Sequence, residues 1–226
     1  MPKTSLQRAR FALREVWSAE LENVSPKGIK EMRSLIWLMA ASTAFWIGGC
    51  TSHMDPTAFV QRYVALHQSG DVDGLLALHT EDSEFIIPGQ DPVRGHAALR
   101  GLFSWDVVLG TELIMEDIHL DGDTVVIDTI VERNKWFEAI GVSETRYKPG
   151  TRLVLRDGRI AGTYLSGFDE RTHSRVVEGF GRLIQWLSAN RPEAQNRLLP
   201  NGMFRYDAES AHLWLTVMEE WQRSEQ

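Results

Sequence analysis

The spacing of apolar positions changes along the chain, and these changes predict the order of its elements. Around Phe59–His67, and again after Asp71, apolar residues recur every three or four positions, as in amphipathic helices. A third helix is expected at His96–Phe103. A strand at Ser83–Ile87 precedes it and is stopped by Pro88-Gly89.

From residue 111 onward the spacing becomes alternate, which predicts β-hairpins. Thr111–Leu120 and Thr124–Phe137 are expected as two strands joined by a tight turn at Asp121-Gly122-Asp123. Thr151–Leu155 and Arg159–Ser166 are expected to pair in the same way around a second Asp-Gly turn.

The last part of the chain returns to helical spacing. Glu170–Leu187 and Ala208–Trp221 each carry one apolar stripe, and residues 191–202 between them are expected as a loop or short helix. Because such a stripe has to be buried, we expect both helices to pack on the preceding domain. Helices, then antiparallel strands, then helices predict an α+β fold.

The first 49 residues do not fit this pattern. Ser34–Gly49 is an uncharged, strongly apolar run of 16 residues, shorter than the ~20 residues of a membrane-spanning helix. It ends in Ile47-Gly48-Gly49-Cys50, and Cys50 is the only cysteine in the chain. This arrangement resembles the lipobox of bacterial lipoproteins, which implies cleavage before Cys50 and attachment of lipid to its thiol. A short buried helix with an incidental cysteine is the alternative.

The lipobox resemblance implies a lipid-anchored protein of the cell envelope. Because Thr51 follows the cysteine instead of Asp, we expect the outer membrane in a cell with two membranes. Residues 1–31 make the polar segment before the apolar run far longer than a signal peptide needs. We therefore expect translation to start at Met32, and the alternative is that residues 1–31 are a genuine N-terminal segment. The predicted division is an N-terminal extension with signal peptide at 1–49, an α+β domain at 50–166 and a helical extension at 167–226.

Charge and composition narrow the partners. After residue 49 the chain holds 17 basic and 27 acidic residues, a net charge of −10. Because an acidic body is repelled by phosphates, we expect no nucleic-acid partner and membrane attachment through lipid alone. A single cysteine allows no intramolecular disulfide. The seven histidines show no metal-ligand spacing and no phosphate-binding loop occurs, so neither a metal nor a cofactor is expected.

Several segments together resemble a known family. Phe59–Ala65, then Gly70-Asp71-Val72-Asp73-Gly74, and then Pro88 and Arg94-Gly95 before a helix are similar to the start of the NTF2-like superfamily. That superfamily includes ketosteroid isomerases, SnoaL-type polyketide cyclases and limonene epoxide hydrolases. The resemblance covers about residues 55–166. It implies a cone of curved antiparallel sheet wrapped on three N-terminal helices, with a ligand pocket at its open end. Such a fold hosts enzymes, binding proteins and scaffolds alike.

The resemblance also bears on isomerase chemistry. The isomerase branch uses a tyrosine hydroxyl and two carboxyl groups. Tyr63 matches the first-helix tyrosine, whereas Ile87 and Thr151 stand where the carboxyl groups are expected. We therefore expect no ketosteroid isomerisation, although a steroid-sized apolar ligand could still fit.

The strand at 124–137 supplies other candidates. Strict alternation puts Asp128, Glu132, Asn134 and Trp136 on one face. If that face points into the cone, Asp128 and Glu132 become candidate acids or bases with a raised pKa, beside Tyr63. If it points outward, both acids are solvated or paired with Arg152. The ligand-binding candidates are Trp105, Asn134, Trp136, Tyr147 and Tyr164. Apolar residues on both faces of this strand suit a homodimer formed through the sheet.

Three functions remain open from the sequence. The first is an extracytoplasmic, lipid-anchored protein that binds a small apolar molecule or a protein partner in or around its cone. The second is a SnoaL-like cyclase, isomerase or hydrolase that uses an inner-sheet carboxylate. The third is a scaffold. A pocket plugged by tryptophans from 208–226 would favour the scaffold, and an enclosed pocket with a carboxylate near Tyr63 would favour the enzyme.

Overall fold

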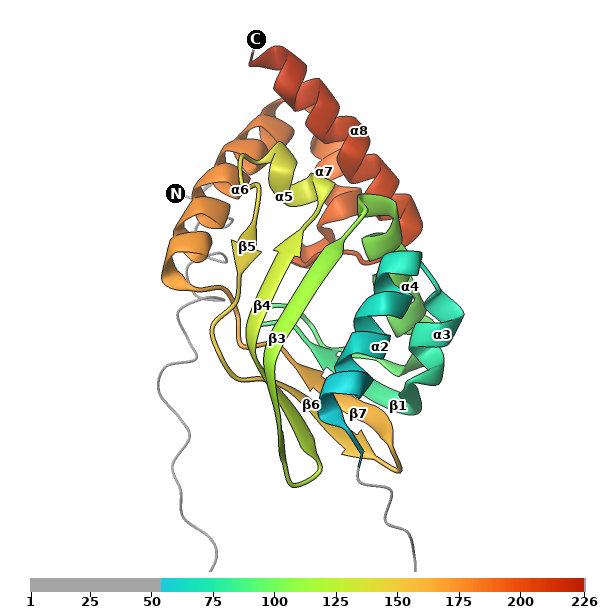
Figure 1. The fold of residues 1–226 in the computed structure, drawn as a ribbon. Coiled ribbons are helices and arrows are strands. Elements are labelled where there is room, and N and C mark those ends of the chain that lie inside the picture. Colours follow the sequence, from blue (N-terminus) through green and yellow to red (C-terminus); the bar gives the residue numbers. More distant parts are fainter. Residues whose placement is uncertain (1–53, 226) are drawn as a thin grey trace, which may run out of the picture.

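The structure, a computed structural model, describes residues 54–225 (Figure 1). Cys50, Met32 and the predicted signal peptide lie outside the described residues. Among the helices of residues 54–225, none combines the length and the apolar character that crossing a membrane requires.

Within residues 54–225, two helices come first and a third follows the first two strands, and local chemistry explains several of their ends. They are α2 (Pro56–Ser69), α3 (Val72–Ala77) and α4 (Gly95–Leu109). The Asp55 carboxylate accepts hydrogen bonds from two backbone N–H groups in the first turn of α2. Asp71 caps α3 through the N–H of Gly74. Gly70 ends α2 in the left-handed conformation, with φ 70°.

In residues 54–225, seven strands form one sheet in the order β2-β1-β7-β6-β4-β3, with β5 paired to β4. The pairs are antiparallel except β1 with β7, which is parallel. This parallel pair joins segments separated by α4 and most of the sheet, so no local turn signal announced it. The strands are β1 (His79–Ile86), β2 (Val93–Arg94), β3 (Glu112–Asp121), β4 (Thr124–Arg133), β5 (Thr145–Arg146), β6 (Thr151–Arg156) and β7 (Arg159–Tyr164).

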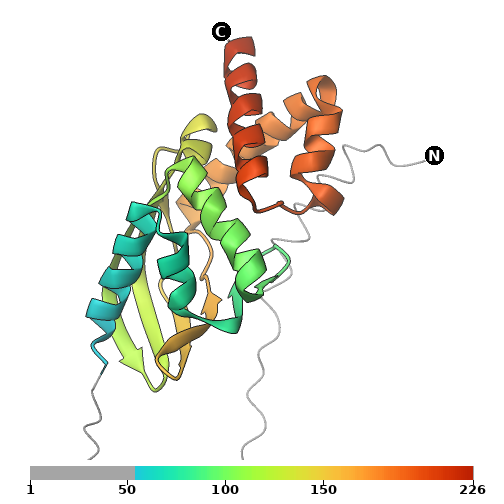
Figure 2. The same cartoon turned by 90° about the vertical axis from the view of Figure 1, so that its right-hand side faces the viewer.

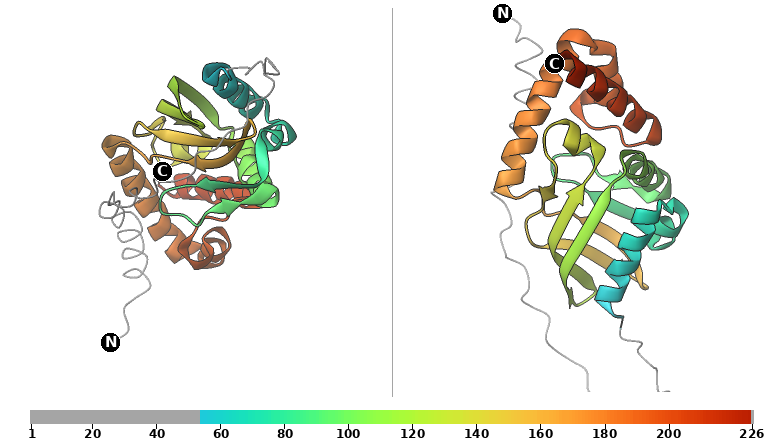
Figure 3. Two further views of the ribbon diagram at one scale, coloured as in Figure 1. Left: turned by 90° about the horizontal axis from the view of Figure 1, so that it is seen from below. Right: turned by 45° about the horizontal axis from the view of Figure 1, so that its top comes forward.

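The sheet curves into a cone, and α2 to α4 close its open side (Figures 1 and 3). Helix α2 packs on β3 at one edge of the sheet, and α4 packs on β1 near the other edge. The inward side chains of the strands and helices make one apolar cluster, which we call the cone core. Its members include Val60, Phe85, Leu99, Leu102, Leu113, Ile127, Ile130 and Leu153.

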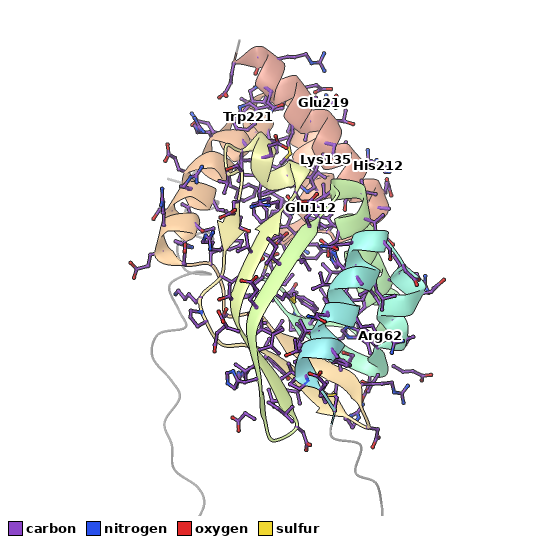
Figure 4. All side chains as sticks on the ribbon, viewed as in Figure 1. Arg62, Glu112, Lys135, His212, Glu219 and Trp221 are labelled. Atoms are coloured by element: carbon purple, nitrogen blue, oxygen red, sulfur yellow. The ribbon has the colours of Figure 1, made fainter. Side chains whose placement is uncertain are left out.

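The remaining helices form a second layer over one end of the cone (Figure 2). They are α5 (Lys135–Ala139), α6 (Glu170–Asn190), α7 (Pro192–Leu198), the 3-10 turn η1 (Pro200–Gly202) and α8 (Ala208–Ser224). Helix α8 packs against α4 and α5, and Figure 4 labels Lys135 and His212 on two of these helices. We call α5 to α8 the cap. Its own apolar cluster, the cap core, includes Trp105, Leu109, Trp136, Phe180, Ile184, Leu187, Trp214 and Trp221.

The predicted strand at 124–137 ends early. It stops at Arg133, and the helix α5 begins at Lys135, because the Asn134 side chain accepts a hydrogen bond from the N–H of Phe137 and caps that helix. Trp136 is therefore a helical residue in the cap core, and not a strand residue.

The alternation within β4 also departs from the prediction. Ile127 and Ile130 both face the cavity although they lie three residues apart. The shift occurs between the paired positions Glu116–Thr129 and Ile118–Ile127, where Asp117 on β3 has a positive φ of 54°. Thr129 Oγ1 donates a hydrogen bond of 2.6 Å to the Asp117 carboxylate and so supports this backbone conformation. Strict alternation along β4 therefore fails at Asp128.

Candidate functional site

A cavity of about 760 Å³ runs through the cone and under the cap. Its size is that of a pocket for a drug-sized or steroid-sized molecule. Most of the lining side chains are apolar and come from both cores, for example Phe85, Leu102 and Leu153 of the cone and Phe180 and Ile184 of the cap. Polar side chains also line it. They are Tyr63, His67, Asp106, Glu132, Asn134, Tyr147 and Tyr206, the amides Gln90, Gln195, Asn196 and Asn201, and smaller groups such as Thr111 and Thr151.

Glu132, near the end of β4, has hydrogen-bond donors on both carboxylate oxygens. Tyr147 Oη donates to Oε2 at 2.5 Å, and Asn134 Nδ2 donates to Oε1 at 2.7 Å. Asn134 is held in place by its second role as the cap of α5. The carboxylate is thus fixed in orientation at the cavity wall.

The surroundings of Glu132 make it a group that titrates near neutrality. Burial raises the pKa of Glu132 to about 7, and the negative charge of Asp106 adds to the rise. The hydrogen bond from Tyr147 and the charge of His67 act in the opposite direction but do not cancel it. A carboxyl group whose pKa lies near the working pH can both give and take a proton.

His67 on α2 and Asp106 on α4 form a second ionisable unit in the same cavity. His67 Nε2 lies 3.2 Å from Asp106 Oδ2, and the other carboxylate oxygen accepts a hydrogen bond from Thr111 Oγ1 at 3.5 Å. Burial alone would lower the pKa of His67, but the hydrogen bond and charge of Asp106 outweigh it and raise the pKa above its ordinary value. The imidazolium form of His67 is therefore favoured beside Asp106.

Three tyrosines face the same charges. Burial, together with the charges of Asp106 and Glu132, raises the pKa values of Tyr63, Tyr147 and Tyr206 well above the ordinary range. Their hydroxyl groups consequently stay protonated and are available as hydrogen-bond donors. Because one pair of carboxylates acts on all three, these residues form a single electrostatic cluster.

Most of the sequence-predicted site residues come together in this cavity. Tyr63, Glu132, Trp105, Asn134, Trp136 and Tyr147 all line it. Ile87 and Thr151, the residues that the isomerase resemblance compares with carboxyl groups, line it as well. The positions are therefore cavity positions, but their side chains carry no acid.

Two predicted residues lie elsewhere. Asp128 does not line the cavity, since the shift in alternation turns it outward, where His119 Nδ1 lies 3.6 Å from its carboxylate. Tyr164 also points away from the cavity, because the preceding residue Thr163 is the one that lines it. The Tyr164 hydroxyl donates to Glu84 Oε1 at 2.6 Å, and the Arg152 guanidinium lies 5.6 Å from its ring centroid. The structure therefore places neither side chain in the cavity.

Sequence reasoning did not place His67 and Asp106 among the site residues. His67 lies one turn after Tyr63 on the buried face of α2, and a histidine on that face was an available signal. Asp106 is an acid in the last turn of α4, where the helix dipole disfavours negative charge. Nothing in the sequence indicated that these two side chains would meet, because they lie 39 residues apart.

Two further features of the described residues narrow what the cavity can do. No group of three or more His, Cys, Asp or Glu side chains within residues 54–225 is arranged to hold a metal ion. Trp214 and Trp221 are packed inside the cap core and are not among the side chains lining the cavity. The cavity is therefore walled by the cap and is not plugged by the α8 tryptophans.

The fold and the cavity agree with a comparison against protein families. Residues 60–163 match the model of the SnoaL-like domain. The chain therefore carries a SnoaL-like domain of the NTF2-like superfamily, in which α2 to β7 form the cone. The cap helices α6 to α8 lie beyond the matched residues.

Three solved structures with a similar fold each match about half of this chain. One is SalBIII, an epoxide hydrolase/cyclase-like enzyme of pyran ring formation in the polyether salinomycin, with 18% identity, TM-score 0.45, and coverage of 52% of this chain and 92% of its own. TerC, co-crystallised with polyporic acid, has 21% identity, TM-score 0.43, and coverage of 55% and 99%. An NTF2-like protein from Burkholderia xenovorans has 24% identity, TM-score 0.41, and coverage of 53% and 93%. At these scores the matches carry no argument about function.

Proposed function

We propose that this protein is an acid–base enzyme that moves protons on an apolar, carbonyl-containing small molecule, as in isomerisation or ring closure. The observation that carries the proposal is the pair of cavity carboxylates, Glu132 and Asp106, held in different environments. Glu132 titrates near neutrality and accepts two hydrogen bonds. Asp106 faces a histidine whose pKa is raised. Two carboxyl groups in unlike environments are the arrangement from which an acid and a base can be assigned.

The proposed chemistry assigns one role to each carboxyl group. Asp106, as carboxylate, takes a proton from the carbon next to the substrate carbonyl. The electrons of that C–H bond form the carbon–carbon double bond of an enol, and the carbonyl oxygen receives the proton of neutral Glu132. Asp106 ends protonated and Glu132 ionised, and collapse of the enol with a proton returned to carbon restores both. His67 stabilises Asp106, and the Tyr63 hydroxyl is a further donor in the same cavity.

Hydrogen–deuterium exchange tests this proposal without knowledge of the substrate. An apolar bicyclic ketone such as 2-tetralone is incubated with the protein in deuterated buffer, and loss of the signal of its C–H groups beside the carbonyl is followed by NMR. We expect exchange well above the buffer rate. The enzymatic rate should fall as the pH rises through about 7, because Glu132 then loses the proton that it must donate.

Substitutions sharpen the test. Asp106→Asn is expected to abolish the enzymatic exchange, while Asp128→Asn, on the outer face of the same sheet, is the matched control and should leave it unchanged. Exchange that persists in Asp106→Asn, or that rises through pH 7 instead of falling, would contradict the assigned roles. Absence of exchange across a panel of such ketones would contradict the proposed function.

We also propose that Cys50 carries a lipid that anchors the protein in the cell envelope. The support is the run Ile47-Gly48-Gly49-Cys50 after the apolar residues 34–46. On expression in a bacterium with two membranes, the wild type is expected in the outer-membrane fraction with the mass of a lipid-modified chain. Cys50→Ser should remove the added mass and release the protein from that fraction. A substituted protein that stays firmly in the membrane would refute the anchor.

A further inference from the structure

The cavity crosses the boundary between two apolar clusters. Its lower part is walled by side chains of the cone core, such as Leu113, Ile127 and Leu153. Its upper part is walled by side chains of the cap core, such as Val176, Phe180 and Ile184. Leu199 and Phe204, which pack against the cap core, continue the upper wall.

The polar residues of the site fall at this boundary on two separate segments. Along α4, the change from cone core to cap core falls between Phe103 and Trp105, and Asp106 directly follows Trp105. From β4 into α5, Ile130 belongs to the cone core and Trp136 to the cap core, and both Glu132 and Asn134 lie between them.

A third segment repeats the arrangement. Tyr147 packs on the cone core, and its ring centroid lies 4.9 Å from that of Phe168, which packs on the cap core. Its hydroxyl reaches Glu132 at the same level. Asp106, Glu132, Asn134 and Tyr147 therefore make a polar waist between two mainly apolar parts of the cavity, and we keep this name for them. The cap part also carries the amides Gln195, Asn196 and Asn201.

We infer that the cavity takes a molecule whose oxygen-bearing group lies in its middle, between two apolar arms. One arm occupies the cone and the other lies under the cap. An oxygen placed against the apolar side chains of either part would lack a hydrogen bond, which is costly, whereas the waist offers donors. This inference deepens the proposed function and rests on it, since it takes the waist residues as the groups that meet the reacting oxygen.

Two ketones of the same composition separate this inference from a one-ended pocket. In 7-tridecanone the carbonyl lies at the centre of the chain, and in 2-tridecanone it lies at the end. Binding of each to the full chain is measured by calorimetry or native mass spectrometry. We expect the central ketone to bind at least about tenfold more tightly, a difference of about 1.4 kcal/mol. Equal affinity, preference for the terminal ketone, or no binding of either would overturn the inference.

Narrowing each end locates the two arms. Met115→Trp fills the cone end and Leu199→Trp fills the cap end, and both residues are half-buried and line the cavity. Each is expected to weaken binding of 7-tridecanone at least about fivefold. Ile114→Trp, on the exposed side of the same strand as Met115, is the matched control and should leave binding unchanged. Near-ultraviolet circular dichroism checks that each variant is folded. If only one of the two substitutions weakened binding of 7-tridecanone, the arm at the other end would be refuted.

The outcomes for the two proposals are separable, because ketone binding needs no turnover. A preference for 7-tridecanone without hydrogen–deuterium exchange would refute the enzyme and leave the two-armed cavity. Exchange on 2-tetralone together with equal binding of the two tridecanones would leave the enzyme and refute the two-armed cavity.

Discussion

The two faces of the sheet each carry a glutamate that accepts a hydrogen bond from a tyrosine. Inside the cone, Tyr147 donates to Glu132 at 2.5 Å, and on the outer face Tyr164 donates to Glu84 at 2.6 Å. The local hydrogen bond is the same, but the pKa values of the two carboxyl groups depart in opposite directions from that of an ordinary glutamate. Burial and the charge of Asp106 raise the pKa of Glu132 to about 7, while the hydrogen bond from Tyr164 and the Arg94 guanidinium lower the pKa of Glu84.

The difference shows that the hydrogen bond alone does not decide whether such a carboxyl group is charged. Outside, Glu84 keeps contact with water and gains the cation of Arg94 at 3.3 Å. Inside, Glu132 is partly shielded from water and feels the negative charge of Asp106. Removal from water and a neighbouring negative charge both disfavour the ionised form, so the cavity and the cap above it turn a common pair into an acid–base group.

The largest expected effect comes from removing the cap. Ending the chain at Ser166 would expose the apolar wall of the cavity and remove the buried side chains of α6 and α8. Since each buried large side chain contributes about 1.5–3 kcal/mol, the loss should exceed a typical margin of about 5 kcal/mol and prevent cooperative folding. Thermal unfolding followed by circular dichroism measures this. Ending the chain at Gln222, outside the cap core, is the control, and an unchanged melting temperature after truncation at Ser166 would contradict the role of the cap.

Replacing each glutamate in turn tests whether only the inner pair, Tyr147 and Glu132, contributes to the exchange activity. Glu132→Gln removes the proton donor and keeps the shape of the side chain, so the exchange rate on 2-tetralone should fall about 10²–10⁴-fold. Glu84→Gln alters the same residue type on the outer face and should change the rate less than about twofold. Similar losses in both variants would mean that the substitutions act through the fold.

The pH dependence of stability should have opposite signs for the two pairs. Because the pKa of Glu132 is raised above its ordinary value of 4.5, its contribution to stability is full at low pH and is lost as the pH rises toward about 7. The free energy of unfolding of the wild type should therefore fall by up to about 3 kcal/mol over this range, relative to Glu132→Gln. For Glu84, whose pKa is lowered, the contribution is present above the ordinary pKa and is lost as the pH falls.

Urea unfolding is measured at a series of pH values in the wild type, Glu132→Gln and Glu84→Gln. It gives the difference in free energy of unfolding between the wild type and each variant. If the two free-energy differences changed with pH in the same direction, the contrast between the inner and outer faces would be contradicted. The comparison uses differences between variants, so the remaining titrating groups cancel.

The smallest expected effect belongs to the tyrosine hydroxyl groups. Tyr147→Phe removes a hydrogen bond to a buried carboxyl and should cost about 1.5–3 kcal/mol of stability. It should also raise the pKa of Glu132 further, because that hydrogen bond holds it down. Tyr164→Phe, on the partly exposed outer face, should cost less than about 1 kcal/mol. Carbon-13 NMR of the glutamate carboxyl groups follows both titrations, and an unchanged or lowered Glu132 titration in Tyr147→Phe would contradict the assigned hydrogen bond.

Much of the fold follows from local signals in the sequence. Asp55, Asp71 and Asp207 each cap the helix that was expected after them, because a carboxylate satisfies N–H groups that the helix leaves free. The Asp-Gly turns at 121–122 and 157–158 join the strands that were expected on either side. The stripes of α6 and α8 are buried in the cap core, as one-sided apolar helices require. The resemblance found in residues 55–166 agrees with the family match at 60–163.

The candidate site depended on features that no local pattern carries. The alternation of β4 predicts that Asp128 and Glu132 share a face, but the alternation changes beside Asp117, which has a positive φ on the neighbouring strand, and only Glu132 lines the cavity. His67 and Asp106 meet because α2 and α4 both close the same cone. The pKa of Glu132 depends on burial under the cap and on Asp106. Local patterns predict most of the longer helices and strands, because caps, turns and periodicity act over a few residues. Which acids lie in the cavity, and how they are charged, follows from the tertiary structure, because burial and the distances between remote segments set both.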